Sequence, residues 1–244
     1  MSVNNNPKYT KFIPLVIFMW EKFYPSVKIT IIYIDEKIPD ELLPYEDYIT
    51  LFKPIENIHT AFIAQMVRML YAGLFSPEEV VMITDIDSIP ANSDYFNYTP
   101  KNVNAHISFR PENAVSTNQI SIMFNANKSK NWSAIFGIKS INDINKFLIN
   151  NMKKTYDGEH GGNSWFSDQE YLYTYVMEWK YMGNEVIFLN DSETKYKRLD
   201  WYSYNYDRNK FVDCMKTNVF SDAHIYAHSC CWNYNDINYI ISLS

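Results

Sequence analysis

The chain has 244 residues, a hydrophobic fraction of 47% and an aromatic fraction of 17%, which is enough for one large domain with a full core. Its net charge is −6, so no extended polyanion-binding surface and no nucleic-acid partner are expected, and a phosphate site would have to be built locally. The three cysteines form no Cys-x-x-Cys pair and no apolar run approaches about 20 residues, so neither a zinc site nor a membrane span is expected.

Helices and strands alternate along the first half of the predicted structure. After a polar, Asn-rich start, apolar residues at helical spacing predict helices, and β-branched runs predict strands. The expected order is a helix over 9–23, a strand over 27–34, a strand over 48–52, a helix over 60–75 and a strand over 80–83. Such alternation favours an α/β protein with a mostly parallel sheet, and the chain shows no internal repeat or linker.

The strand over 80–83 runs through Thr84 into an Asp-x-Asp motif formed by Asp85 and Asp87. Side chains alternate along a strand, so both aspartates are expected on one side of the chain, where the strand ends. Two such carboxylates repel each other unless a cation lies between them, and Mg²⁺ or Mn²⁺ suits oxygen ligands. Because ligands of open α/β sheets bind beyond the carboxyl ends of the strands, the motif predicts a metal that holds a phosphate. The alternative is a turn in which the aspartates only cap backbone amides.

The second half predicts fewer regular elements. Strands are expected over 105–109, 119–124 and 186–189, and helices over 138–152 and 168–179. The segment 153–163 between these helices holds three of the six glycines, so we expect a mobile loop there. The last third, from residue 195, is aromatic and irregular, and it ends in an apolar segment over 237–243.

Several segments, taken in chain order, resemble those of nucleotide-sugar-dependent glycosyltransferases of the GT-A fold. They are Gln65-Met66-Val67-Arg68 before the motif strand, the Asp-x-Asp motif itself, Ile122-Met123-Phe124-Asn125-Ala126, Trp165-Phe166-Ser167-Asp168-Gln169, and 223–232, where Trp232 follows His224 by eight residues. Glycogenin-like and lipopolysaccharide galactosyltransferase-like enzymes have the same His-to-Trp spacing. The Asn-rich start, 139–144 and 198–200 are similar to a branch of such enzymes from giant viruses.

This resemblance covers about residues 3–240. It implies a single GT-A domain over 1–244 with a Rossmann-like central sheet, a nucleotide-binding half over about 1–100 and an acceptor-binding half over about 101–244. Two departures stand out. The first strand of the fold is expected to be very short, and Cys230 and Cys231 replace the Lys and Pro that precede the Trp in the family. The family's Lys contacts the donor diphosphate, so either His228 substitutes for it or the diphosphate is held differently.

For the donor side, the resemblance implies that Asp87 binds the metal directly and that Asp85 touches the ribose or shares the metal. A third metal ligand would be His224, with His228 as its competitor. The other donor contacts implied are Arg68, which would pair with a motif aspartate or the donor, and Tyr9 or Asn5 at the base. A packed histidine and an ordinary surface arginine are the alternatives.

For the acceptor side, the resemblance places Asp168 near the acceptor hydroxyl or the anomeric carbon. An inverting enzyme needs a carboxylate base within hydrogen-bond reach of the acceptor, whereas in a retaining enzyme a carboxylate on the other face, or the donor's own phosphate, does the work. The alternative is an aspartate that only complements the dipole of the helix it begins. Trp165 would stack on a sugar ring or merely pack. Further sugar contacts are expected from Gln169, Asn125, Arg198 and Asp200.

The predicted function is metal-dependent transfer of a hexose or pentose from a nucleotide sugar, UDP-linked, to a glycan or glycoprotein. One alternative is a carbohydrate-binding or scaffold protein of the same fold without activity. Another is an Asp-x-Asp phosphatase, in which the first aspartate is a nucleophile, although that class carries its motif at the first strand. Without a basic and apolar leader at the start of the sequence, the expected compartment is the cytoplasm, viral or host.

Overall fold

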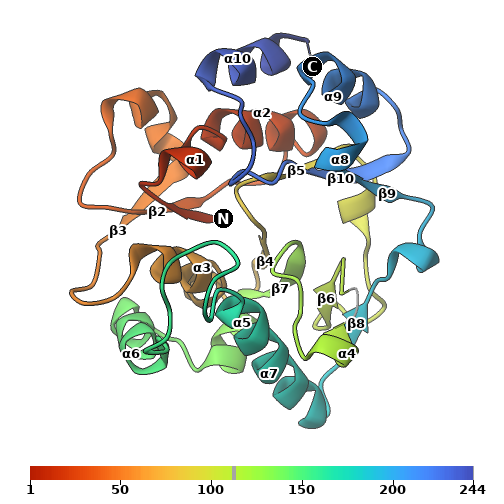
Figure 1. Cartoon of the computed structure of the whole chain (residues 1–244). Coiled ribbons are helices and arrows are strands. Elements are labelled where there is room, and N and C mark those ends of the chain that lie inside the picture. Colours follow the sequence, from red (N-terminus) through yellow and green to blue (C-terminus); the bar gives the residue numbers. More distant parts are fainter. Residues whose placement is uncertain (112–113, 244) are drawn as a thin grey trace.

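The computed structural model describes residues 1–111 and 114–243, in which helices cover both sides of a set of short strands (Figure 1). The strands are β1 (Ser2–Asn4), β2 (Ile31–Ile34), β3 (Ile49–Phe52), β4 (Val80–Ile83), β5 (Ser88–Pro90), β6 (His106–Ser108), β7 (Asn125–Lys128), β8 (Val186–Phe188), β9 (Lys197–Asp200) and β10 (Phe220–His224). The helices are α1 (Pro7–Thr10), α2 (Ile13–Phe23), α3 (Thr60–Tyr71), α4 (Ala114–Thr117), α5 (Ser129–Phe136), α6 (Ile141–Asn151), α7 (Ser167–Tyr181), α8 (Trp201–Tyr204), α9 (Arg208–Met215) and α10 (Tyr234–Leu243).

The strands form three sheets among the described residues. The first has the order β1-β2-β3 and is parallel. The second has the order β5-β10-β9, in which β10 is antiparallel to β5 and parallel to β9. The third has the order β4-β7-β6-β8, in which only β6 and β8 are parallel. The expectation of one mostly parallel central sheet is therefore wrong: the sheets are split and mixed, because β1 pairs only with β2 and β4 pairs only with β7.

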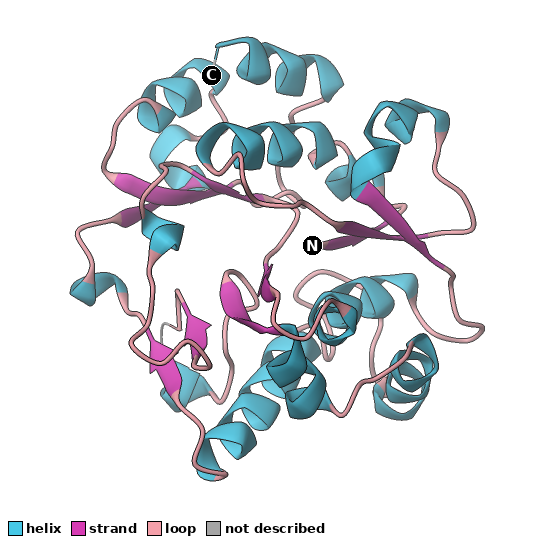
Figure 2. Cartoon of the chain, turned by 180° about the vertical axis from the view of Figure 1, so that it is seen from behind, coloured by secondary structure: helices cyan, strands magenta, loops and turns pink. Residues whose placement is uncertain are grey.

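Strand β2 separates two hydrophobic clusters. Ile31 and Tyr33 belong to a cluster with α2, α9 and α10, whereas Ile32 and Ile34 belong to a cluster with α3, α5, α6 and α7. Successive side chains of a strand point to opposite faces, so a strand that is buried on both faces is apolar throughout, as β2 is. Both views show the two groups of helices on opposite sides of the strands (Figures 1 and 2).

Several predicted elements differ from the observed ones for local reasons. The helix expected over 9–23 is divided into α1 and α2, and Pro14 lies in the first turn of α2, where its missing N–H is tolerated. No strand covers 119–124: Phe124 has a φ of +57°, and β7 begins at the next residue. Helix α7 spans almost the predicted range, and so do α3, β3 and β8. The last third is more regular than expected, because it contains β9, α8, α9, β10 and α10. No helix in the described part of the chain is long and apolar enough to span a bilayer.

Candidate active site

The Asp-x-Asp motif lies directly after β4, as predicted, but its two carboxylates have different partners. Asp85 pairs with the guanidinium of Arg68, and about a quarter of its side chain is exposed. Asp87 is buried and faces the C-terminal segment: its Oδ2 accepts a hydrogen bond of 2.8 Å from the amide of Ala227 and lies 3.7 Å from Nε2 of His224. The motif therefore joins helix α3 on one side to the end of the chain on the other.

Strand pairing brings His224 to the motif across 137 positions of sequence. His224 ends β10, where it lies opposite Ser88 of β5 and beside Asp200 of β9. The next residue, Ile225, donates its amide to the carbonyl of Asp87 at 2.9 Å. Of the two candidate histidines, the structure thus places His224 against the Asp87 carboxylate.

The environment of Asp87 favours its ionised form. Burial alone would raise the pKa of Asp87, but the nearby imidazole of His224 and the hydrogen bond from the amide of Ala227 outweigh burial and lower it. Asp87 is therefore a carboxylate at neutral pH, as a metal ligand must be.

Arg68 connects the motif to the start of helix α7. Its side chain is buried, its Nε donates to the carbonyl of Gln65 at 3.1 Å, and its two terminal nitrogens reach Asp85 and, at 3.5 Å, Asp168. A buried arginine between two carboxylates is not the surface arginine of the alternative interpretation. It fixes two acidic groups, 83 residues apart, on one guanidinium.

Asp168 stands in the first turn of α7 with 4% of its surface exposed. Burial raises its pKa to about 6, although the charge of Arg68 and the amide of Gln169 oppose the rise. A carboxyl group with a pKa close to neutrality can both take and release a proton at working pH.

This raised pKa predicts a measurable effect on stability. The folded state holds the Asp168 proton more tightly than the unfolded chain does, since the pKa of an unfolded Asp is about 3.9. Asp168 therefore lowers the free energy of unfolding as the pH rises from about 4 to about 6. In this window its contribution approaches about 1.4 kcal/mol per pH unit. Urea unfolding of the wild type and Asp168→Asn at several pH values should show this slope only in the wild type. Equal slopes in both proteins would contradict it.

Four aromatic side chains pack together next to His224. His160, from the glycine-rich loop, stacks on His228 with 3.5 Å between ring centroids, and it also contacts Trp165 and Tyr226. Tyr226 lies in turn against His228 and His224. The loop over 153–163 is therefore packed against the segment that follows β10.

Trp165 is held by a chain of polar contacts. Its carbonyl accepts a hydrogen bond of 3.0 Å from Gln65, whose oxygen accepts one of 2.8 Å from Tyr156. The rings of Tyr156 and Trp165 are nearly parallel, at an angle of 16°. Since Gln65 also supplies the carbonyl that binds Arg68, one turn of α3 positions both the arginine and the aromatic cover.

The remaining predicted residues lie at different distances from this centre. Tyr9 is close: burial, and then the charge of Asp87, raise the pKa of its phenol. Asn5 is exposed in the turn between β1 and α1. Gln169 follows Asp168 in α7 and is half-buried, whereas Asn125 is fully buried at the start of β7 and donates to the carbonyl of Ser121 at 2.8 Å.

Arg198 and Asp200 lie on β9. Arg198 donates to Asp222 at 3.0 Å and so joins a buried ionic network in which Asp222 also pairs with Arg110. Asp200 accepts a hydrogen bond of 3.0 Å from Tyr202 and neighbours His224 across the sheet. Of these two residues, only Asp200 adjoins the predicted metal ligands.

Sequence reasoning missed His160, Tyr226 and Tyr156. The glycines at 158, 161 and 162 did indicate a functional loop, and a histidine between them was an available signal. The two tyrosines belong to a set of twenty, which gave no reason to choose them.

The donor set at the motif suits a hard divalent cation. Asp87 supplies a carboxylate oxygen and His224 an imidazole nitrogen 3.7 Å away, and Asp85, two residues before Asp87, is partly exposed. Within residues 1–111 and 114–243, no group of three or more His, Cys, Asp and Glu side chains is already placed around a metal position. Asp85 would have to loosen its contact with Arg68 to become a direct ligand.

Comparison with known proteins identifies the fold. Over 99% of its length the chain matches the galactosyltransferase LgtC, solved in complex with donor and acceptor sugar analogues, at 12% identity and a TM-score of 0.50, covering 94% of that chain. It also matches the glycosyltransferase GlyE of Streptococcus pneumoniae TIGR4 at 16% identity and a TM-score of 0.51, of which it spans only 62%. No family model matches the sequence, and no curated protein matches it. The chain has the GT-A glycosyltransferase fold.

Proposed function

We propose that this protein is a metal-dependent glycosyltransferase that moves a hexose or pentose from a UDP-sugar to a glycan or glycoprotein acceptor. The observation that carries the proposal is the position of Asp87 in a GT-A fold: it is ionised, buried and adjacent to His224. The structures of similar fold include LgtC with donor and acceptor sugar analogues, which supports a sugar donor and a sugar acceptor here.

In this proposal, Asp87, Asp85 and His224 would hold Mn²⁺ or Mg²⁺. When bound, the cation would neutralise the diphosphate as negative charge develops on the leaving oxygen. Asp85 would loosen its contact with Arg68 to reach the cation, and the buried guanidinium would then add a positive charge next to the donor site. We assign Tyr9, in α1, to the N-terminal side of the donor site, because the charge of Asp87 helps to raise the pKa of its phenol.

On the acceptor side, we propose that Asp168 is the proton acceptor. Its pKa of about 6 leaves it mostly ionised at neutral pH and basic enough to receive the hydroxyl proton of an inverting reaction. Another solved structure of this fold is an active-site glutamine-to-glutamate variant of LgtC. The pair Asp168-Gln169 opens α7 here, and Trp165 precedes it as a surface on which a sugar ring could stack.

In this proposal the water-excluding cover comes from His160, Tyr226 and His228, whose rings pack on one another, with Tyr226 also against His224. Excluding water matters because hydrolysis would consume the donor without transfer. The positive φ values of Gly158 (+77°) and Gly161 (+72°) are conformations that residues with a Cβ rarely adopt. These two glycines shape the loop that presents His160.

The test is calorimetric titration of UDP into the protein with Mn²⁺, with Mg²⁺ and with EDTA, and of GDP as a control. We expect binding of UDP that depends on the metal, followed by metal-dependent hydrolysis of one member of a UDP-sugar panel. If neither UDP nor GDP binds in the presence of metal, the proposal of a nucleotide-sugar donor is wrong.

One observation favours a second candidate, a glycan-binding protein without activity. Cys230 replaces the lysine of the related enzymes, and its carbonyl instead accepts a hydrogen bond of 2.9 Å from Nζ of Lys11. Glycan binding on an array, without affinity for UDP or metal, would support this candidate. The phosphatase alternative loses its basis, because the motif follows β4 rather than the first strand of the fold.

A further inference from the structure

Tyr226 lies between two backbone amides that both bind Asp87. The amide of Ile225 donates to the main-chain carbonyl of Asp87 at 2.9 Å, and the amide of Ala227 donates to its Oδ2 at 2.8 Å. In an extended strand, the amides of residues two positions apart are roughly 7 Å from each other, which is twice the rise per residue. A bend at Tyr226 therefore brings both amides to a single residue.

The backbone of Tyr226 has a conformation that its side chain disfavours. Its φ is +63°, in the left-handed region, where a Cβ crowds the backbone and where glycine or asparagine is the usual residue. A bulky residue stays in this conformation only where the surrounding structure holds it there. The contacts of the Tyr226 side chain are the candidates for this restraint.

Four rings from separate segments surround the ring of Tyr226. Its edge-to-face neighbours are His224 (5.3 Å between centroids, 87°), His228 (4.1 Å, 71°) and His160 (5.6 Å, 83°). The ring of Trp201 lies nearly parallel to it, at 6.4 Å and 15°. Edge-to-face and offset parallel pairs are favoured geometries of aromatic rings. These contacts fix the ring of Tyr226, which in turn restricts the plane of the His224 imidazole.

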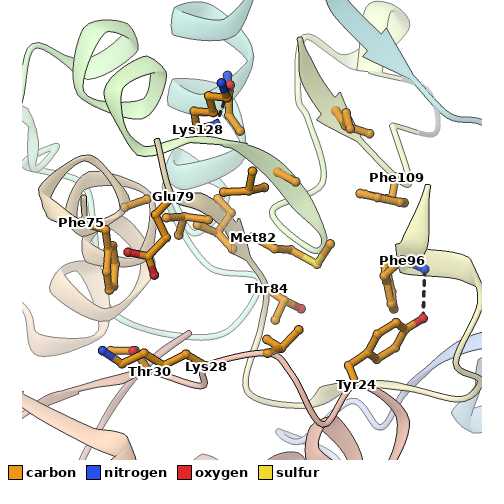
Figure 3. A pocket seen from close by; sticks show the side chains of 18 of the residues that line it. Tyr24, Lys28, Thr30, Phe75, Glu79, Met82, Thr84, Phe96, Phe109 and Lys128 are labelled. Carbon is orange, nitrogen blue, oxygen red and sulfur yellow. Dashed lines mark hydrogen bonds between the residues drawn. The ribbon is translucent and has the colours of Figure 1, made fainter. Parts of the chain in front are cut away.

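The other side of the motif has no comparable packing. Met82 and Thr84 lie on the wall of a groove of about 670 Å³ that follows β4 (Figure 3). Among the described residues that line this groove, neither Asp87 nor any residue of 224–228 is present. The order of the Asp87 end of the motif therefore comes from the segment around Tyr226.

We propose that Tyr226 is a positioning residue for Asp87 and His224: its left-handed backbone aims two amides at Asp87, and its ring fixes the plane of the His224 imidazole. The inference rests on the proposed function, in which these two side chains would bind the cation. Groups that orient metal ligands typically change metal affinity by about 10–100-fold when they are mutated.

Three substitutions separate the ring from the backbone. Tyr226→Phe keeps the ring, Tyr226→Gly removes the ring but allows the left-handed conformation, and Tyr226→Ala removes the ring and retains the Cβ. We expect Tyr226→Phe to bind Mn²⁺ as the wild type does, Tyr226→Gly to bind it at least about 10-fold more weakly, and Tyr226→Ala to bind it more weakly still. Calorimetry at a temperature where circular dichroism shows every variant to be folded would measure this series.

A second measurement uses the metal-free proteins. In NMR spectra, the ring signals of His224 should show increased motion in Tyr226→Gly and Tyr226→Ala but not in Tyr226→Phe. The amide of Ala227 should exchange fastest in Tyr226→Ala, because that variant has lost the contacts that hold the left-handed conformation.

The two measurements distinguish this inference from the proposed function. A wild type that binds neither Mn²⁺ nor Mg²⁺ would contradict the proposed metal site. Unchanged signals of His224 and Ala227 in a folded Tyr226→Ala protein would overturn the role of Tyr226. So would a Tyr226→Ala protein that melts at a lower temperature but binds Mn²⁺ as the wild type does, because its role would then be only structural.

Tyr206→Ala is the matched control. Tyr206 is another tyrosine with a left-handed backbone, at a φ of +57°. It stacks on Trp201, as Tyr226 does, but its other ring contacts are with Tyr204 and Trp232. We expect Tyr206→Ala to lower the melting temperature without changing the affinity for Mn²⁺. Equal losses of metal affinity in Tyr206→Ala and Tyr226→Ala would overturn the proposal, because a general loosening of the aromatic cluster would then explain both.

Discussion

Asp87→Asn is expected to abolish metal-dependent UDP binding and to lower sugar transfer by at least about 100-fold. The amide keeps an oxygen that can accept the hydrogen bond from Ala227, but it removes the negative charge that faces His224. Charge stabilisation by a bound metal is worth several kcal/mol, and each 1.36 kcal/mol changes a rate tenfold. Calorimetry with Mn²⁺ and a transfer assay would measure the two losses.

The matched control is Asp213→Asn, an exposed aspartate on α9 whose nearest cation, Lys216, is 3.9 Å away. It should bind UDP and turn over as the wild type does. Circular dichroism and melting temperature should show that the Asp87→Asn protein is folded. Full activity in a folded Asp87→Asn protein would contradict the role of Asp87 and with it the proposed metal site.

Arg68→Met is expected to destabilise the protein by about 3 kcal/mol, or roughly 10 °C in melting temperature. Removing one partner of a buried ion pair leaves the others as uncompensated charges, here Asp85 and Asp168. Because Arg68 lowers the pKa of Asp168, this pKa should rise above 6 in the variant. The loss should therefore be greatest above pH 7 and smaller near pH 5, where Asp168 is protonated.

Arg208→Met is the matched control for this substitution. Arg208 pairs with Asp236 at 2.6 Å but is 44% exposed, and exposed pairs contribute about 0–1 kcal/mol. The double variant Arg68→Met/Asp168→Asn should recover part of the lost stability. An equal cost for the two arginine substitutions would show that Arg68 is not the buried bridge described here.

The strongest patterns in the sequence predicted the parts of the fold that carry the motif. Helix α3 has an apolar face at helical spacing, and β4 is an apolar run that ends at two aspartates, so each was predictable without tertiary information. Asp168 could be placed at the start of α7 but not inside the protein, because burial depends on what packs against the helix. The raised pKa of Asp168 and its contact with Arg68 therefore could not be predicted from the sequence.

The largest error in the prediction of the fold concerned which strands pair with each other. The sequence pattern identified β4 as a strand but placed a later strand at 119–124 and gave no sign that β7 is the antiparallel neighbour of β4, so the expectation of one parallel sheet rested on alternation alone. In the last third, aromatic residues are so frequent that no single period stands out, which explains why α8, α9 and β10 were not predicted. The resemblance supplied His224 and His228, but it supplied neither His160, which stacks on His228, nor Tyr226, which lies against both His224 and His228.

The contact between Asp87 and Ala227 spans 140 residues, and this separation has a consequence for how the protein acquires its site. During synthesis the motif leaves the ribosome long before β10 exists, so the contact between Asp87 and the segment after β10 cannot form until the chain is almost complete. Long-range contacts of this kind are made late and slowly in folding. A ligand bound between Asp87 and His224 would connect a segment from the first half of the sequence to one near its end. By mass action, such a ligand would stabilise the whole protein and not only a single loop.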